Sequence, residues 1–255
     1  MSIVVDLHSH ILPGVDDGAR SLEESVEIAI AASHDGTKVM AATPHVRDDF
    51  PTAVATMERL VLELNETLLE KGVELRILGG AEIAISSLKA LDADELSRFG
   101  LGGNPHYLLV EFPYFGWPLS LETEIWNLGE RGITPVLAHP ERNPEVHFDP
   151  SMLAPFVAAG ALVQLTAASL DGRLGRRNKR TAHRLVAVGC AHLIASDAHW
   201  PGLRRAGLSS AAAAIGDPRL ANWLVHEVPT AIIENNPIPI RPPARSGLLS
   251  RWFSR

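Results

Sequence analysis

Two histidines separated by one residue are the first side chains in the chain whose spacing could support chemistry. His8 and His10 close the segment V-V-D-L-H-S-H, which begins with an apolar β-branched run. In an extended chain, side chains two residues apart lie on the same side, so both imidazoles would face one point. Neutral imidazole is a common metal ligand, and the pair forms half of a metal site. The alternative is an ordinary pair of surface or core histidines, because short motifs recur by chance.

More histidines and carboxylates follow short apolar runs farther along the chain. The runs cover residues 38–42, 75–78, 107–110, 133–138, 161–165 and 191–195, and the polar residues placed just beyond them are His45, Glu82, Glu111, His139, Thr166, Asp197 and His199. Burying the charged carboxylate of Glu111 would cost free energy unless a metal ion or a cationic side chain paired with it. Asp197 and His199 have an alternative role as a helix N-cap and its neighbour. Asp16 and Asp17 fit a turn in D-D-G, which is the interpretation we prefer for Asp16.

The elements that must position these side chains alternate between strand and helix. Helical stretches are expected at residues 21–34, 51–71, 119–131, 150–159 and 176–188, between the apolar runs. About seven such units predict an α/β fold of the β/α-barrel type, in which the carboxyl ends of the parallel strands converge on one mouth. The polar residues at the strand ends would therefore meet there.

Composition favours a single domain and excludes several functions. The chain has 255 residues, 46% of them hydrophobic, and a formal net charge of -7, which argues against a nucleic-acid-binding surface. A single cysteine permits no internal disulfide, and we find neither a signal peptide nor an apolar run long enough for a bilayer. We therefore expect a cytoplasmic protein.

The C-terminal segment has a different composition. Residues 237–255 are rich in proline and arginine and contain no acidic residue, so we expect a flexible tail after a domain of residues 1–236. The tail is either an unstructured terminus or a weak contact, through its arginines and Trp252 and Phe253, with an anionic membrane or a membrane-bound kinase.

Six motifs together carry a resemblance to a known superfamily: D-L-H-S-H-I-L-P-G-V-D-D-G, A-T-P-H, G-A-E-I, V-E-F-P, A-H-P-E-R and A-S-D-A-H. In this order and spacing the chain resembles the polymerase-and-histidinol-phosphatase (PHP) superfamily. It is most similar to the bacterial protein-tyrosine phosphatases that are encoded with capsular and exopolysaccharide machinery and act on autophosphorylated tyrosine kinases. The resemblance covers residues 3 to 235 and implies a distorted β/α barrel.

The resemblance also implies three divalent metal ions at the mouth, usually manganese or iron-type ions. One ion would take His8, His10, Glu82 and Asp197; a second would share Glu82 and take Glu111 and His139; a third would take Asp17, His45 and His199. Arg142 and Arg204 would grip the phosphate, although Arg205 competes with Arg204 for this role. Ligands of this mixed nitrogen and oxygen type suit zinc, iron or manganese.

The chemistry expected of such a site is phosphomonoester hydrolysis. Metal-bound hydroxide would attack phosphorus in line while the arginines hold the remaining oxygens. The aromatic loop at residues 111–118 either flanks a phosphotyrosine ring or packs against the barrel. Two other functions stay open: a small-molecule phosphatase of the same superfamily, acting on histidinol phosphate or a similar monoester, and a catalytically silent, metal-stabilised scaffold.

Overall fold

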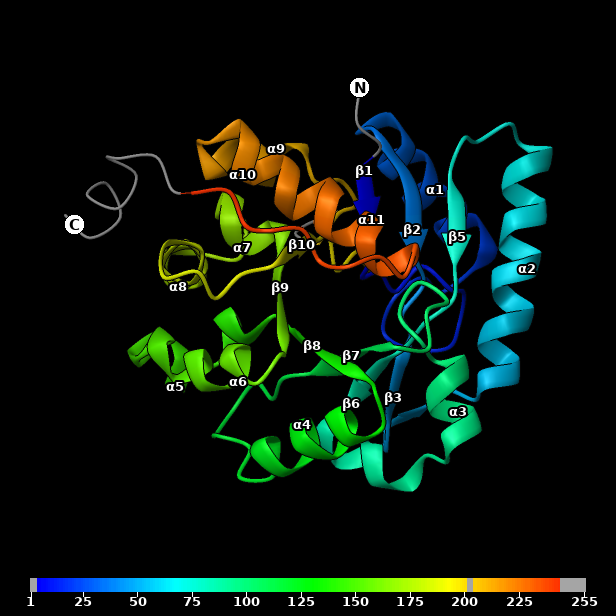
Figure 1. Cartoon of the computed structure of the whole chain (residues 1–255). Coiled ribbons are helices and arrows are strands. Elements are labelled where there is room, and N and C mark those ends of the chain that lie inside the picture. Colours follow the sequence, from blue (N-terminus) through cyan, green and yellow to red (C-terminus); the bar gives the residue numbers. More distant parts are fainter. Residues whose placement is uncertain (1–3, 201–203, 244–255) are drawn as a thin grey trace.

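Two sheets carry the strands in the computed structural model, which describes residues 4–200 and 204–243 (Figure 1). The smaller sheet has the order β1-β2-β5, from β1 (Val4–Asp6), β2 (Thr37–Ala41) and β5 (Arg76–Leu78). The larger has the order β10-β9-β8-β7-β6-β3-β4, from β10 (Leu193–Ala195), β9 (Leu162–Thr166), β8 (Thr134–Ala138), β7 (Tyr107–Glu111), β6 (Glu82–Ala84), β3 (His45–Arg47) and β4 (Phe50–Pro51). All pairs within these sheets are parallel except β3 with β4. The predicted α/β fold is confirmed. The larger sheet has seven strands, which agrees with the number of strand-helix units expected from the sequence.

The chain crosses twice from the small sheet to the large one. It leaves β2 and resumes as β3 after Pro44, and it leaves β5 and resumes as β6 after Gly79 and Gly80. His45 and Glu82, expected just beyond strand ends, therefore begin new strands and pair with each other in register. Proline interrupts the hydrogen bonding between strands because it lacks an amide hydrogen, and glycine weakens a strand because it has no side chain to pack. These two breaks distort the predicted barrel.

Backbone hydrogen bonds join the two sheets beyond the ends of β1 and β10. Asp197 N donates to His8 O at 2.8 Å, and His10 N donates to Ala198 O at 2.7 Å. Asp6, the last residue of β1, accepts from Ser196 N at 2.9 Å through its side chain. These hydrogen bonds hold the first strand beside the last one. They therefore bring the first motif, D-L-H-S-H, next to the last, A-S-D-A-H.

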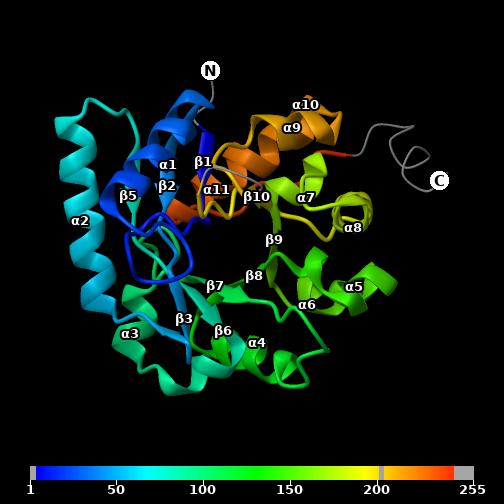
Figure 2. The ribbon, with the colours of Figure 1, turned by 180° about the vertical axis from the view of Figure 1, so that it is seen from behind.

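Helices cover the outer faces of the strands (Figures 1 and 2). Those predicted are α1 (Leu22–His34), α2 (Val54–Glu70), α4 (Leu121–Glu130) and α8 (Arg176–Ala187), while residues 150–159 divide into a 3-10 turn, Pro150–Leu153, and α6 (Ala154–Ala158). The sequence did not predict α3 (Ala93–Arg98), α5 (Pro144–Phe148), α7 (Ala167–Asp171), α9 (Ser209–Ile215), α10 (Pro218–Asn222), α11 (Val228–Ile233), the 3-10 helices η1 (Ile85–Ala90) and η2 (Pro140–Arg142), or the π-helical turn η4 (Trp223–Glu227). Strands covered on both faces read as continuous apolar runs, and all residues of β7, β9 and β10 are buried.

The described part of the expected tail lies against the domain. Trp223 donates its indole hydrogen to Pro239 O at 2.9 Å, and Arg241 donates to Val186 O at 2.7 Å. Residues 244–255, with Trp252 and Phe253, lie outside the described residues. Among the described residues, no helix combines the length and apolar character needed to cross a bilayer.

Candidate metal centre

The predicted ligands converge from positions at or near the ends of the strands. His8 and His10 follow β1, His45 begins β3, Glu82 begins β6, Glu111 ends β7, His139 follows β8, and Asp197 and His199 follow β10. The loop between β1 and α1 adds Asp17. All of these residues are buried except Asp17, whose side chain is 41% exposed. The structure therefore brings together all nine residues that the sequence proposed as ligands.

Glu82 lies at the centre of the cluster. Its Oε2 is 3.2 Å from His10 Nε2, 3.3 Å from His8 Nε2 and 3.2 Å from His45 Nδ1. Its Oε1 is 2.6 Å from His139 Nε2. One carboxylate thus contacts four imidazoles, as expected of a residue shared between neighbouring metal ions.

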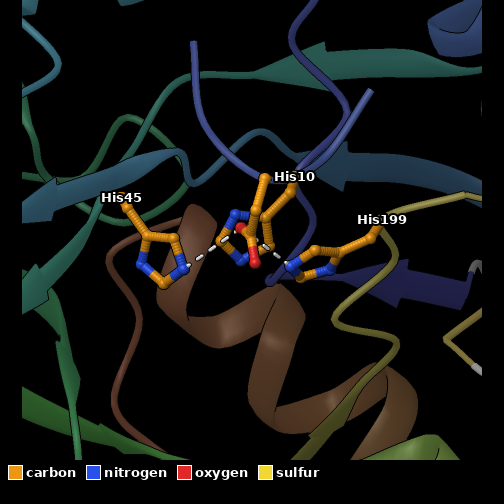
Figure 3. Close-up of side chains that lie close together, drawn as sticks. His10, His45 and His199 are labelled. Carbon is orange, nitrogen blue, oxygen red and sulfur yellow. Dashed lines mark ion pairs between the residues drawn. The ribbon is translucent and has the colours of Figure 1, made fainter. Parts of the chain in front are cut away.

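Three overlapping groups of side chains have the spacing needed to hold a metal ion. They are His8, His10 and Glu82; His45, Glu82 and Glu111; and His10, Asp17, His45 and His199. Figure 3 shows the rings of His10, His45 and His199 facing a common point. The first group lies within the expected first ligand set, and the third contains the expected third set together with His10. His45 belongs to two of the groups, and Glu82 contacts His139 through its other oxygen.

Three histidines have their second ring nitrogen occupied by a partner that accepts a hydrogen bond. His8 Nδ1 is 2.9 Å from the Gln164 amide oxygen, and His10 Nδ1 is 2.7 Å from Asp16 Oδ2. His199 Nδ1 is 3.0 Å from the Asp197 carbonyl oxygen. Each contact fixes the ring and leaves Nε2 directed into the cluster, which is the arrangement that supports metal-ligating histidines.

Several atoms of the cluster are buried and have no hydrogen-bond partner among the described residues. They include Glu82 Oε2, Asp17 Oδ1, His45 Nδ1 and His199 Nε2. In addition, His8 Nε2 and His10 Nε2 are only 3.2 Å apart. Because both Nδ1 atoms face hydrogen-bond acceptors, the lone pairs of these two Nε2 atoms are directed toward each other. Buried polar atoms normally have partners, so a proton or a metal ion must lie between such groups. The donor set is compatible with divalent cations.

Crowding of charged groups shifts the pKa values of two candidate ligands in opposite directions. Burial and the neighbouring charge of Glu82 raise the pKa of Glu111 to about 7, even though Arg47 Nη1 lies 2.9 Å from its Oε1. Burial by itself would also raise the pKa of Glu82, but the charge of His8 holds that pKa well below its usual range. The ionisation of each of these two carboxyl groups therefore depends on the charged neighbours it has in the cluster.

The backbone at two candidate ligands adopts left-handed conformations. His139 has φ 38° and Asp197 has φ 53°, and both residues follow directly from strand ends or one residue beyond. Residues other than glycine rarely adopt positive φ, and such strain is concentrated at functional sites. Gly18 shows a related constraint, because an added Cβ would lie 2.1 Å from His10 O. The D-D-G turn can approach His10 only with glycine at this position.

Arg142 and Arg204 both reach the cluster. Arg142, at the end of η2, donates to Asp197 Oδ2, to Thr166 Oγ1 at 2.8 Å and to Tyr114 Oη at 3.2 Å. Arg204 Nη1 lies 3.5 Å from Asp197 Oδ1, whereas Arg205 is exposed and lines a separate hollow beside Asp35. Of the two adjacent arginines, the structure thus directs Arg204 toward the candidate ligands.

Sequence reasoning missed the supporting roles of Asp16, Gln164 and Asp6, whereas it did place Thr166 at a strand end. Asp16, interpreted as a turn residue, does accept from Gly18 N at 2.9 Å, but it also holds His10 and accepts from His45 N at 3.0 Å. Gln164 and Thr166 come from β9, and Asp6 comes from β1. Asp6 and Gln164 are polar residues inside apolar runs. Burying an unpaired polar group costs free energy, so their position in the sequence could have identified them as residues with a specific partner.

Comparison with known proteins agrees with this geometry. The family model described as "Capsular polysaccharide synthesis, CpsB/CapC" matches residues 4–234. The tyrosine-protein phosphatase YwqE of Bacillus subtilis is 36% identical over 197 residues, which cover 77% of each chain. The chain belongs to the CpsB/CapC family.

Other relatives extend this comparison within the CpsB/CapC family. The putative tyrosine-protein phosphatase CapC of Staphylococcus aureus is 32% identical over 204 residues, 77% of each chain. A crystal structure from work on YwqE of Bacillus subtilis and CpsB of Streptococcus pneumoniae, described there as metal-dependent tyrosine phosphatases, superposes with a TM-score of 0.84 at 32% identity. It covers 94% of this chain and all of that one. Fold and family were therefore both predicted correctly from the motifs.

Proposed function

We propose that this protein is a metal-dependent protein-tyrosine phosphatase. The observation that carries the proposal is the buried cluster around Glu82, with its unpartnered nitrogen and oxygen atoms, placed beside the guanidinium groups of Arg142 and Arg204. Relatives in the CpsB/CapC family that carry the name tyrosine-protein phosphatase support it, as does the structure described as a metal-dependent tyrosine phosphatase.

The ligands of the proposed centre are the nine residues of the cluster, and the proposed cofactors are three divalent ions, with manganese preferred over iron or zinc. Such ions, when bound, polarise phosphoryl oxygens and lower the pKa of bound water toward neutrality. The ligands are His8, His10, Asp17, His45, Glu82, Glu111, His139, Asp197 and His199.

The arginines would bind the phosphate monoester. Arg142 is 9% exposed and pairs with Asp197, so its charge is directed into the mouth and away from solvent. Guanidinium groups stay charged and make paired hydrogen bonds to phosphate oxygens. Tyr114 stacks on His139 with ring centroids 5.6 Å apart and planes 8° apart, which places an aromatic face at the entrance. A phosphotyrosine ring would enter beside this face.

The proposed physiological substrate is a bacterial tyrosine kinase of capsule or exopolysaccharide synthesis, in the cytoplasm. The family description, which refers to capsular polysaccharide synthesis, supports this assignment. The part of the tail beyond residue 243 would add at most a weak contact with the kinase or the membrane.

The test is phosphate release from a phosphotyrosine peptide by metal-stripped protein to which manganese, iron or zinc is returned. We expect release only with metal, and loss of release together with lower metal content in His139→Ala. Full activity of metal-stripped His139→Ala would contradict the metal assignment.

A second substrate separates the proposed function from the alternatives. Faster turnover of histidinol phosphate than of the peptide would favour a small-molecule phosphatase. No turnover of either substrate with any metal would favour the scaffold.

A further inference from the structure

A hollow of about 340 Å³ lies directly beside the candidate metal centre. It opens at the carboxyl ends of β6 and β7, where Ala84 and Glu111 end these strands. Its walls are mainly apolar and include Ile85, Ser86, Phe115 and Trp117. No residue of this hollow other than Glu111 belongs to the proposed ligand set.

The hollow and the metal centre share a wall. Glu111 lines the hollow, and its Oε2 lies 3.8 Å from His45 Nδ1 in the cluster. Ala84 is two residues beyond Glu82 on the same strand. Because one residue of extended chain spans about 3.3 Å, a side chain within a few residues of a bound phosphotyrosine reaches this hollow.

The loop that forms the outer wall is anchored next to the phosphate-binding arginine. Asn143, the residue after Arg142, donates to Pro113 O at 2.7 Å and to Gly116 O at 2.9 Å. Trp117 is packed against Phe112 and Phe156, with ring centroids 5.6 and 5.8 Å apart. The distance from the hollow to Arg142 is therefore set by fixed contacts, as a specificity pocket requires.

Phe115 is the exception on this wall, because its side chain is 85% exposed. An apolar ring held at the rim of an apolar hollow gains free energy when a second apolar group covers it. Glu111 is the one charged residue among the described residues that line the hollow, and its Oε1 lies 2.9 Å from Arg47 Nη1. The hollow thus offers apolar contact and no unpaired charge, which suits a neutral side chain better than an ionic one.

We propose that this hollow is a specificity subsite that takes one apolar side chain located within three residues of the phosphotyrosine in the substrate protein. The inference rests on the proposed phosphatase function and adds a preference in sequence to it. Phe115 and Trp117 would cover the apolar side chain on one side, and Ile85 would cover it on the other.

The test compares phosphotyrosine peptides that carry serine at the three positions on each side, with leucine placed at one of these positions at a time. We expect the manganese-loaded wild-type protein to show a kcat/KM about tenfold higher for at least one leucine peptide than for the all-serine peptide, since partial burial of leucine contributes about 1.4 kcal/mol. Phe115→Ala, which removes the rim, and Ser86→Trp, which fills the hollow, should reduce this ratio to about twofold or less.

Phe148→Ala is the matched control, because Phe148 is also exposed, at 87%, and does not line the hollow. This variant should keep the tenfold ratio. Turnover of p-nitrophenyl phosphate is measured for every variant as the reference for intact catalysis. Equal rates for all peptides with the wild-type protein would overturn the inference, and so would a ratio that survives in both Phe115→Ala and Ser86→Trp. Absence of p-nitrophenyl phosphate turnover in the wild-type protein would overturn the proposed function, and the subsite with it.

Discussion

The two sides of the candidate metal centre are supported in different ways. On the side built from β1 and β10, the rings of His8, His10 and His199 are each held through their second nitrogen. On the side built from β3 and β8, His139 Nδ1 has no hydrogen-bond partner among the described residues, and both ring nitrogens of His45 face candidate ligands, Nδ1 toward Glu82 and Nε2 toward Asp17. The first side is thus oriented by the protein, whereas the second depends on contacts with Glu82. Glu82→Gln and Asp16→Asn test this difference.

Loss of the Glu82 carboxylate should have the largest effect, because both sides contact it. We expect Glu82→Gln to lower kcat by about a thousandfold or more, since metal ions contribute several kcal/mol to transition-state stabilisation. Elemental analysis should show reduced metal content, and circular dichroism should show a retained fold. Glu66→Gln, a change at an exposed carboxylate, is the control. A Glu82→Gln protein with full metal content and full activity would refute the shared role.

A smaller loss is expected from the supporting residue Asp16. Asp16→Asn keeps the shape of the side chain but weakens its hold on His10 Nδ1. Partners of this kind contribute about 10- to 100-fold to metal affinity or activity. Isothermal titration with manganese and steady-state kinetics would measure both quantities. The exposed Asp48→Asn is the matched control, and equal behaviour of the two variants would show that the held side needs no such support.

Arg142→Lys should affect substrate binding more than metal binding. Lysine keeps the positive charge but cannot make the paired contacts of a guanidinium group. We expect KM for the phosphotyrosine peptide to rise about 10- to 100-fold, in line with the roughly 1.5 to 3 kcal/mol of a hydrogen bond to a charged group. Metal content should be unchanged. Arg205→Lys should leave KM unchanged, because Arg205 lies beside Asp35 in a separate hollow; a matching rise in that variant would reverse the assignment of Arg204 and Arg205.

His192 shows what burial does to a histidine outside the metal centre. Burial and the charge of Arg241 lower its pKa to about 4, and its Nδ1 accepts from Val163 N at 3.1 Å. The unfolded chain binds a proton at this residue below pH 6.5, whereas the folded protein does so only near pH 4. The contribution of neutral His192 to the free energy of unfolding should therefore be fully present above pH 6.5. It should decrease by about 3 kcal/mol as the pH falls toward 4.

Urea unfolding of metal-free protein between pH 4 and pH 7.5 measures this loss. His192→Gln should flatten the profile, and the exposed His34→Gln should not. An unchanged slope in His192→Gln would assign the acid sensitivity to other groups, such as those of the metal centre.

Most of the fold was predictable because periodicity and helix signals are local. Ser21 accepts from Glu24 N at 3.3 Å and opens α1 where the sequence placed it, and the strands β7, β8 and β9 fall within one residue of their predicted limits. The C-terminal helices α9, α10 and α11 were missed, because their short segments have no clear periodicity and form by packing against the rest of the domain.

The types and order of the candidate ligands were determined by the sequence alone. Strand periodicity sets which side chains share a face, and the motif order then predicts the family and the nine residues. The contacts that orient those residues were decided only by tertiary structure. His8 meets Gln164 across 156 positions, and His139 meets Glu82 across 57. Contacts between residues so far apart in the sequence depend on how the strands pair around the mouth. A short sequence motif does not specify that pairing.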